Sequence, residues 1–125
     1  MESVALNWPA ITLGTVAAYG LGLIWFSPIL FGKAWSQGSH NLARPKTPPI
    51  AAMIVQLTAV IALAILVGMT ASTDALGTAI IGILSAALFV AGIDLFSQKS
   101  TTATFIDAGY VVASGTLMIL SQGLL

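Results

Sequence analysis

The length of the uncharged apolar stretches constrains this chain more than any other feature. Residues 3–32 and residues 47–73 contain no Asp, Glu, Lys or Arg. A helix needs about 20 mostly apolar residues to cross the hydrocarbon core of a bilayer. Because lipid offers no partner for backbone N–H and C=O groups, a segment within it must satisfy those groups internally, as a helix does. The sequence therefore predicts membrane-spanning helices.

The composition indicates lipid rather than water as the main solvent. Hydrophobic residues make up 58% of the 125 residues and charged residues only 6%, and the mean hydropathy is +1.01. A soluble domain carries charge on roughly a quarter of its residues. The formal net charge is zero, which offers no basic surface for nucleic acid. Cysteine is absent and histidine occurs once, so we expect no disulfide, no metal site and no cofactor.

Four stretches are long and apolar enough to cross the membrane. We expect one domain over residues 1–125, an all-α integral membrane bundle of four transmembrane helices in an antiparallel, up-and-down arrangement. The expected helices cover residues 8–27, 49–71, 75–96 and 102–123. Pro28 lacks the N–H that a helix interior requires. It predicts a kink, or a bend into a short interfacial segment over residues 29–35.

The cations indicate how the bundle is oriented. Lys33, Arg44 and Lys46 lie in the expected loop over residues 32–48, and Lys99 lies in the connection before the last helix. All four cations therefore fall on one side of the membrane, which the positive-inside rule makes cytoplasmic. We expect a protein of the bacterial inner (cytoplasmic) membrane with both termini on the non-cytoplasmic side.

Two aspartates lie inside apolar segments on either side of Lys99. At about 1.5 Å per residue, Asp94 and Asp107 lie roughly 5 to 10 Å inside the cytoplasmic boundary. Intramembrane carboxylates often mark proton or ion sites. Residues this close to the boundary can also reach water or be neutralised by a nearby Lys or Arg, so both interpretations stay open. The candidate polar site for a proton or an ion comprises Asp94, Asp107, Tyr110, Gln56 and Ser114.

Aromatic and small residues predict contacts with the membrane and between helices. Trp25, Phe31 and Trp35 are expected to form an aromatic belt at the membrane interface. Small residues recur every fourth position in the first helix and allow another helix to approach, either within one chain or between chains. These residues are Gly14, Ala18 and Gly22. Four short helices leave much apolar surface, so besides the lipid bilayer we expect a homo-oligomer or docking to a larger membrane complex.

The motif over residues 25–35, W-F-S-P-I-L-F-G-K-A-W, resembles the signature of domain-of-unknown-function family 1761. That family consists of small polytopic membrane proteins. The last helix also looks similar around Asp107 and Tyr110, although the family usually has Asn at the first position and often His after the tyrosine, where this chain has Val111. The resemblance covers nearly the whole chain and implies four membrane helices, but it implies no particular activity.

Three classes of function compete at this point. An accessory or structural membrane protein is favoured by the small size, the short connections and the ridge of small residues. An oligomeric permeation or transport protein for small solutes, ions or protons is favoured by the intramembrane polar residues. A membrane-embedded enzyme on a lipophilic substrate would use Asp94, Asp107 and Tyr110 as acid–base groups. Without a nucleophile–base pair, a metal cluster or a phosphate loop, we assign no catalytic residue.

Overall fold

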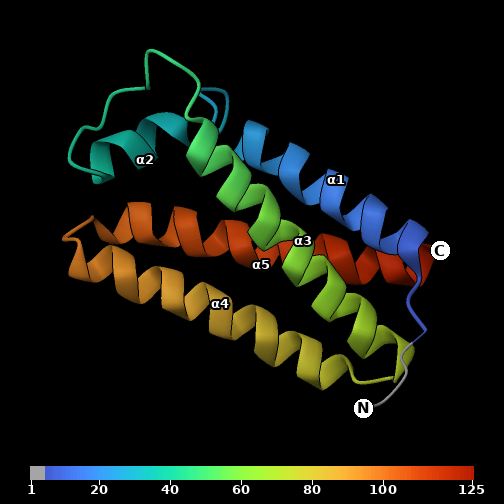
Figure 1. Ribbon diagram of the computed structural model, residues 1–125. Coiled ribbons are helices and arrows are strands. Elements are labelled where there is room, and N and C mark those ends of the chain that lie inside the picture. Colours follow the sequence, from blue (N-terminus) through green and yellow to red (C-terminus); the bar gives the residue numbers. More distant parts are fainter. Residues whose placement is uncertain (1–4) are drawn as a thin grey trace.

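A computed structural model describes residues 5–125, and this part of the chain consists of helices and their connections (Figure 1). The helices are α1 (Trp8–Trp25), α2 (Gly32–Gly38), α3 (Ile50–Ser72), α4 (Leu76–Phe96) and α5 (Thr101–Leu124). Four of them, α1, α3, α4 and α5, are long and apolar enough to cross a membrane. The prediction of an all-helical protein with four long apolar helices is thus confirmed.

Side chains with hydrogen-bonding oxygens set the first turns of α1 and α5. The Asn7 side chain accepts a hydrogen bond from the backbone N–H of Ala10 at 3.2 Å, and proline stands in the first turn of α1. The Ser100 hydroxyl accepts from the N–H of Ala103 at 3.1 Å. Both contacts satisfy backbone donors that have no partner within the helix.

The first helix ends earlier than predicted. It stops at Trp25, whereas the sequence suggested residue 27, and a tight turn around Pro28 follows. The N–H of Gly32 donates to the carbonyl of Ser27 at 2.9 Å and closes this turn. Helix α2 then begins at Gly32, so the first part of the predicted loop over residues 32–48 is helical. Proline explains the break because it cannot donate the helical hydrogen bond.

Helix α5 is the central element of the bundle. It contacts α1, α2, α3 and α4, and Figure 1 shows α4 running beside it while α2 lies over its beginning. It also carries the largest buried share of the four long helices. Polar residues inside a membrane face other helices rather than lipid. The helix with the most polar residues is therefore the one that the other helices surround. Its buried polar side chains are Thr104, Ser114 and Ser121.

The small-residue ridge of α1 packs against α5 of the same chain. A Cβ atom at Gly14 would lie 3.3 Å from the backbone of Met118, and Ala18 is fully buried. This close approach helps to build an apolar core in the middle of the bundle. The buried residues of the core are Ile11, Ala18, Val60, Ala64, Val67, Ile83 and Met118.

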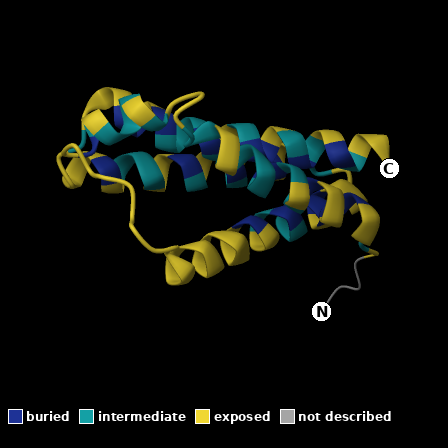
Figure 2. Ribbon diagram, turned by 90° about the horizontal axis from the view of Figure 1, so that it is seen from above, coloured by how far each residue is buried: buried dark blue, intermediate teal, exposed yellow. Residues whose placement is uncertain are grey.

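The first half of α3 stands apart from the rest of the bundle. Residues 50–59 are all exposed, whereas the second half of the same helix contributes Val60, Ala64 and Val67 to the core. Figure 2 shows this exposed first half diverging from the other helices after the connection over residues 39–49. One side of the bundle is therefore lined by a helix that has few protein neighbours at that end.

Candidate functional site

A lysine joins the two intramembrane aspartates. The Nζ atom of Lys99 lies 3.7 Å from Asp94 Oδ1 and 3.3 Å from Asp107 Oδ2. The short connection between α4 and α5 brings the three residues together, because Asp94 lies in the last turn of α4 and Asp107 in the second turn of α5. Of the four cations in the chain, the structure places Lys99 beside the aspartates.

Trp35 of α2 completes this charge cluster. Its indole Nε1–H donates a hydrogen bond to Asp107 Oδ1 at 2.8 Å. The ammonium group of Lys99 lies 4.9 Å from the centroid of the Trp35 ring. A charge-assisted hydrogen bond and a cation–π contact therefore fix α2 to the beginning of α5. The charge cluster comprises Asp94, Lys99, Asp107 and Trp35.

Trp25 and Phe26, at the start of the turn, also contact α5. The Trp25 indole N–H donates to the carbonyl of Ile106 at 2.9 Å, and its ring lies 4.8 Å from that of Phe31. Phe26 packs edge-on against Tyr110 at 5.5 Å between ring centroids. Both tryptophans of the predicted aromatic belt thus direct their indole donors at α5. Their position in a bilayer interface stays a prediction.

The C-terminal end of α2 is attached to the connection between α4 and α5. The N–H of Ser100 donates to the carbonyl of Gly38 at 2.9 Å, and His40 Nε2 lies 2.9 Å from the carbonyl oxygen of Ser97. A Cβ atom at Gly38 would collide with the Ser100 side chain. Helix α2 is therefore held at its middle by Trp35 and at its C-terminal end by this backbone contact.

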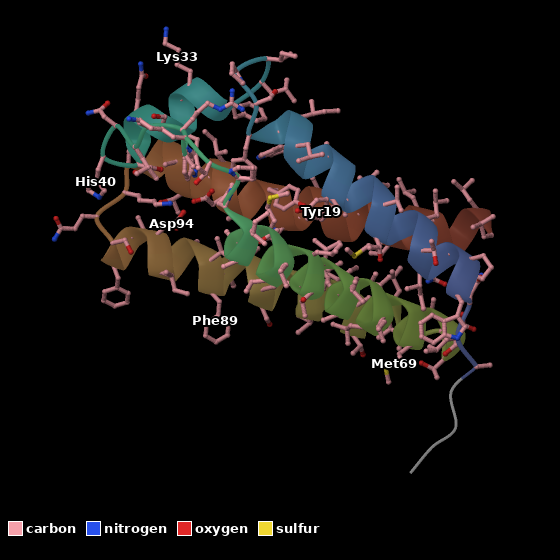
Figure 3. All side chains as sticks on the ribbon, turned by 45° about the horizontal axis from the view of Figure 1, so that its top comes forward. Tyr19, Lys33, His40, Met69, Phe89 and Asp94 are labelled. Carbon is pink, nitrogen blue, oxygen red and sulfur yellow. The ribbon has the colours of Figure 1, made fainter. Side chains whose placement is uncertain are left out.

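Beside the charge cluster lies a cavity of about 1250 Å³, walled by α1, α3, α4 and α5, with α2 and the 39–49 connection at one end. Most of its wall is apolar. Figure 3 shows Tyr19 directed from α1 toward α3, where its hydroxyl lies 3.4 Å from the carbonyl of Met53. The polar residues that line the cavity include Tyr19, Lys33, Arg44, Gln56, Asp107 and Ser114.

The structure separates the predicted polar site into two groups. Tyr110, Gln56 and Ser114 line the cavity, Asp94 belongs to the charge cluster, and Asp107 belongs to both. The Tyr110 hydroxyl donates to the carbonyl of Ala18 at 2.8 Å and is thereby occupied. Gln56 lies on the exposed half of α3 and shares only the cavity wall with Asp107.

Ser114 is a deeply buried residue of the cavity wall. Its side chain is 2% exposed, and among the described residues its hydroxyl has no hydrogen-bond partner. On the same helix, the hydroxyls of Thr116 and Ser121 each donate at 2.8 Å to the carbonyl four residues earlier. A buried polar group without a partner is rare because its desolvation is costly. Two other buried groups of the described residues share this lack of a partner, the Ser39 hydroxyl and one oxygen of Asp94.

The cavity and the role of Trp35 were not foreseen from the sequence. The cavity depends on the divergence of α3 from its neighbours, which no local pattern encodes. For the role of Trp35 the sequence does contain a signal. This tryptophan, seven residues after Pro28, carries an indole donor that needs a partner when it is partly buried. Pairing it with Asp107 required knowing that α2 folds back over α5.

Three long apolar helices gathered around a fourth, more polar one, with a charge cluster at one end, define a small helical membrane protein with several spanning segments. The chain belongs to the family described as protein of unknown function (DUF1761), whose model matches residues 9–122. The resemblance inferred from residues 25–35 is thereby confirmed. No curated protein and no solved structure matches the chain.

Proposed function

We propose that this protein binds a small amphipathic molecule in its cavity and is a non-catalytic component of the membrane. The mainly apolar cavity beside the exposed half of α3 carries this proposal. Ligand sites are typically cavities of several hundred Å³ or more, with mainly apolar walls and a few polar groups that orient the guest. A volume of about 1250 Å³ with Tyr19, Gln56 and Ser114 in its wall meets this description.

The exposed half of α3 supports entry of the guest from the membrane. Ala52, Met53 and Gln56 belong to the cavity wall, and all three are exposed. In a bilayer, side chains without protein neighbours at this depth face lipid. A molecule already dissolved in the membrane therefore reaches the cavity without crossing a polar barrier.

For the orientation, we propose an antiparallel, up-and-down bundle with both termini on the non-cytoplasmic side of a bacterial inner membrane. The cations support this arrangement, because Lys33, Arg44, Lys46 and Lys99 belong to α2 or to the two connections at the same end of the bundle (Figure 1). Figure 3 shows Lys33 and Asp94 at that end and Met69 at the other. By the positive-inside rule, the cavity then opens toward the cytoplasmic leaflet.

Permeation of a small solute or ion is the second candidate function. A smaller hollow of about 240 Å³ lies at the opposite end, with Thr70, Asp74 and Gln122 in its wall. Within the described part of the chain, its lining shares no residue with that of the large cavity. The apolar core lies between them, contributing Met118 to the large cavity and Val67 to the small one. Transport would require this core to open, so binding has the stronger support.

Assembly with other chains and enzymatic activity have weaker support. The outer face of α4 is strongly apolar, with Phe89 75% exposed and directed away from the bundle in Figure 3. Lipid, a second copy of the chain or a larger complex could each cover this face. That the protein is a homo-oligomer or an accessory subunit is a proposal that rests on this exposed apolar face. An acid–base role is less supported because Asp94 and Asp107 are bound by Lys99, and Tyr110 by a backbone carbonyl.

Filling the cavity tests the binding proposal. Ala86 of α4 lines the cavity, whereas its neighbour Ser85 is exposed outside it. Proteoliposomes containing the full chain are irradiated with a lipid whose acyl chain carries a diazirine, and labelled peptides are identified by mass spectrometry. We expect Ala86→Trp to reduce labelling around Ser114 and Met118 roughly tenfold, a change equivalent to about 1.4 kcal/mol of binding. Ser85→Trp is the control and should leave it unchanged.

The result that contradicts the proposal is equally specific. If wild-type labelling falls only on outer-face residues such as Phe89, or if both tryptophan variants reduce it alike, the cavity does not hold the probe. Circular dichroism and gel filtration of both variants establish that each retains the helical fold.

A further inference from the structure

The cavity carries positive charge at one end. Lys33 of α2 and Arg44 of the 39–49 connection belong to its wall, at the end where the charge cluster lies. Within residues 5–125, the ion pairs of the structure involve Lys99. Lys33 and Arg44 are exposed and hold no carboxylate of the described part of the chain. Their charge is thus free to act on a guest at the mouth of the cavity.

The acidic group of the cavity wall does not cancel this charge. Asp107 lines the cavity, but one of its oxygens accepts the Trp35 indole N–H and the other lies 3.3 Å from the Lys99 ammonium. Asp94, which lies outside the lining, is paired with the same lysine at 3.7 Å. The charge cluster holds two carboxylates and one lysine and is therefore net negative. Adding the charges of Lys33 and Arg44 makes this end of the cavity net positive.

We propose that the guest is an anionic amphiphile, with its phosphate or carboxylate group at Lys33 and Arg44 and its hydrocarbon chain along the cavity. This inference rests on the proposed function and adds the chemical class of the ligand. A guanidinium group binds phosphate or carboxylate through two parallel hydrogen bonds, and a lysine ammonium adds a mobile point charge. Figure 3 shows Lys33 directed outward at the end of the molecule, the level at which lipid headgroups lie in the proposed orientation.

The length of the cavity fits a single hydrocarbon chain. Along α5 its wall extends from Asp107 to Met118, a rise of about 16 Å at 1.5 Å per residue. This is roughly half of the hydrocarbon thickness of about 30 Å, so the cavity spans about one leaflet. Ser114 lies along this path in the cavity wall.

The test compares headgroups that carry the same photoreactive chain. Full-length protein in phosphatidylcholine vesicles receives one of three diazirine probes: phosphatidylglycerol, phosphatidylcholine or a free long-chain fatty acid. The variant is Lys33→Gln with Arg44→Gln. Its control is Lys46→Gln, because Lys46 lies in the same exposed connection but not in the cavity wall. Labelling is read on the peptide that contains Ser114 and Met118.

We expect at least one anionic probe to label this peptide roughly tenfold more than phosphatidylcholine does. The double variant should bring that ratio close to one, and Lys46→Gln should preserve it. Raising the salt concentration should also lower the ratio, because exposed charges are screened. Stronger labelling by phosphatidylglycerol identifies a bilayer lipid as the source, and stronger labelling by the fatty acid identifies a free amphiphile; either result supports the inference.

Two other outcomes would overturn it and are distinguishable. Equal labelling by the phosphatidylcholine probe, unaffected by the double variant, refutes the anionic specificity while cavity binding still stands. If none of the three probes labels the peptide, the binding proposal fails as well.

Discussion

At the residue scale, Lys99 is the side chain that compensates the negative charge of the two intramembrane aspartates. It faces Asp94 and Asp107 together, and the ring of Trp35 covers it. Removing one partner of a buried ion pair is costly because the remaining charge loses its compensation. Asp94 depends on this compensation in particular, because its second oxygen is buried and lacks a partner within the described chain.

Replacing this lysine should therefore destabilise the protein. Lys99→Met leaves two carboxylates without a cation, and we expect it to lower the free energy of unfolding by about 2 kcal/mol, between the values typical of exposed and buried pairs. The measurement is unfolding in mixed micelles with increasing sodium dodecyl sulfate. Lys46→Met is the control, an exposed lysine outside the ion pairs of the described residues, and should change stability by less than about 0.5 kcal/mol.

A triple variant separates lost charge pairing from lost packing. Combining Lys99→Met with Asp94→Asn and Asp107→Asn removes all three charges, and we expect it to recover most of the lost stability. A Lys99→Met protein as stable as the Lys46→Met control would refute the structural role of the cluster.

At the element scale, the turn between α1 and α2 determines how α2 meets α5. Pro28 stops α1, and Gly32 comes so close to the preceding turn that a Cβ atom there would collide with the carbonyl oxygen of Phe26 and lie 2.8 Å from that of Ser27. Glycine is thus required by space, since its φ is not in the left-handed region. The spacing of proline and glycine in this motif lets Trp35 reach Asp107.

Adding one methyl group at this glycine should disturb the whole turn. We expect Gly32→Ala to cost about 2 kcal/mol of unfolding free energy, because backbone atoms cannot move aside as a flexible side chain can. Gly20→Ala, where a Cβ atom meets open space, should be neutral or slightly stabilising because alanine favours helix. Trypsin cleavage after Lys46 should also accelerate in Gly32→Ala alone. Equal stability of the two variants would contradict this explanation of the motif.

The same elements show how far the sequence carries the fold. The four long helices follow from local hydropathy, and the end of α1 follows from Pro28, because both depend on neighbouring residues only. The position of α2 could not be predicted in the same way, since it depends on contacts between residues about 70 positions apart, such as Trp35 and Asp107. The choice of Lys99 rather than Arg44 or Lys46 as the neutralising cation depends on the same long-range geometry.

At the scale of the whole molecule, a polar helix is surrounded by apolar ones, with the cations gathered at one end. Helix α5 contacts the other four helices, while the first half of α3 diverges and leaves the cavity beside it. The candidate polar residues were recognisable from the sequence as charges and hydroxyls in apolar segments. Their division between a paired cluster and a cavity wall was not, because it depends on where α3 lies.

Single-cysteine labelling tests the central claim, that the long helices cross the membrane with the cationic connections on one face. The chain contains no cysteine, so Lys46→Cys, Thr73→Cys and Gln98→Cys each introduce one thiol, all at exposed positions in the connections. In right-side-out vesicles, an impermeant maleimide added outside should label only position 73, and positions 46 and 98 only after the vesicles are opened. Labelling of positions 46 and 98 from opposite faces would contradict the membrane arrangement and every proposal built on it.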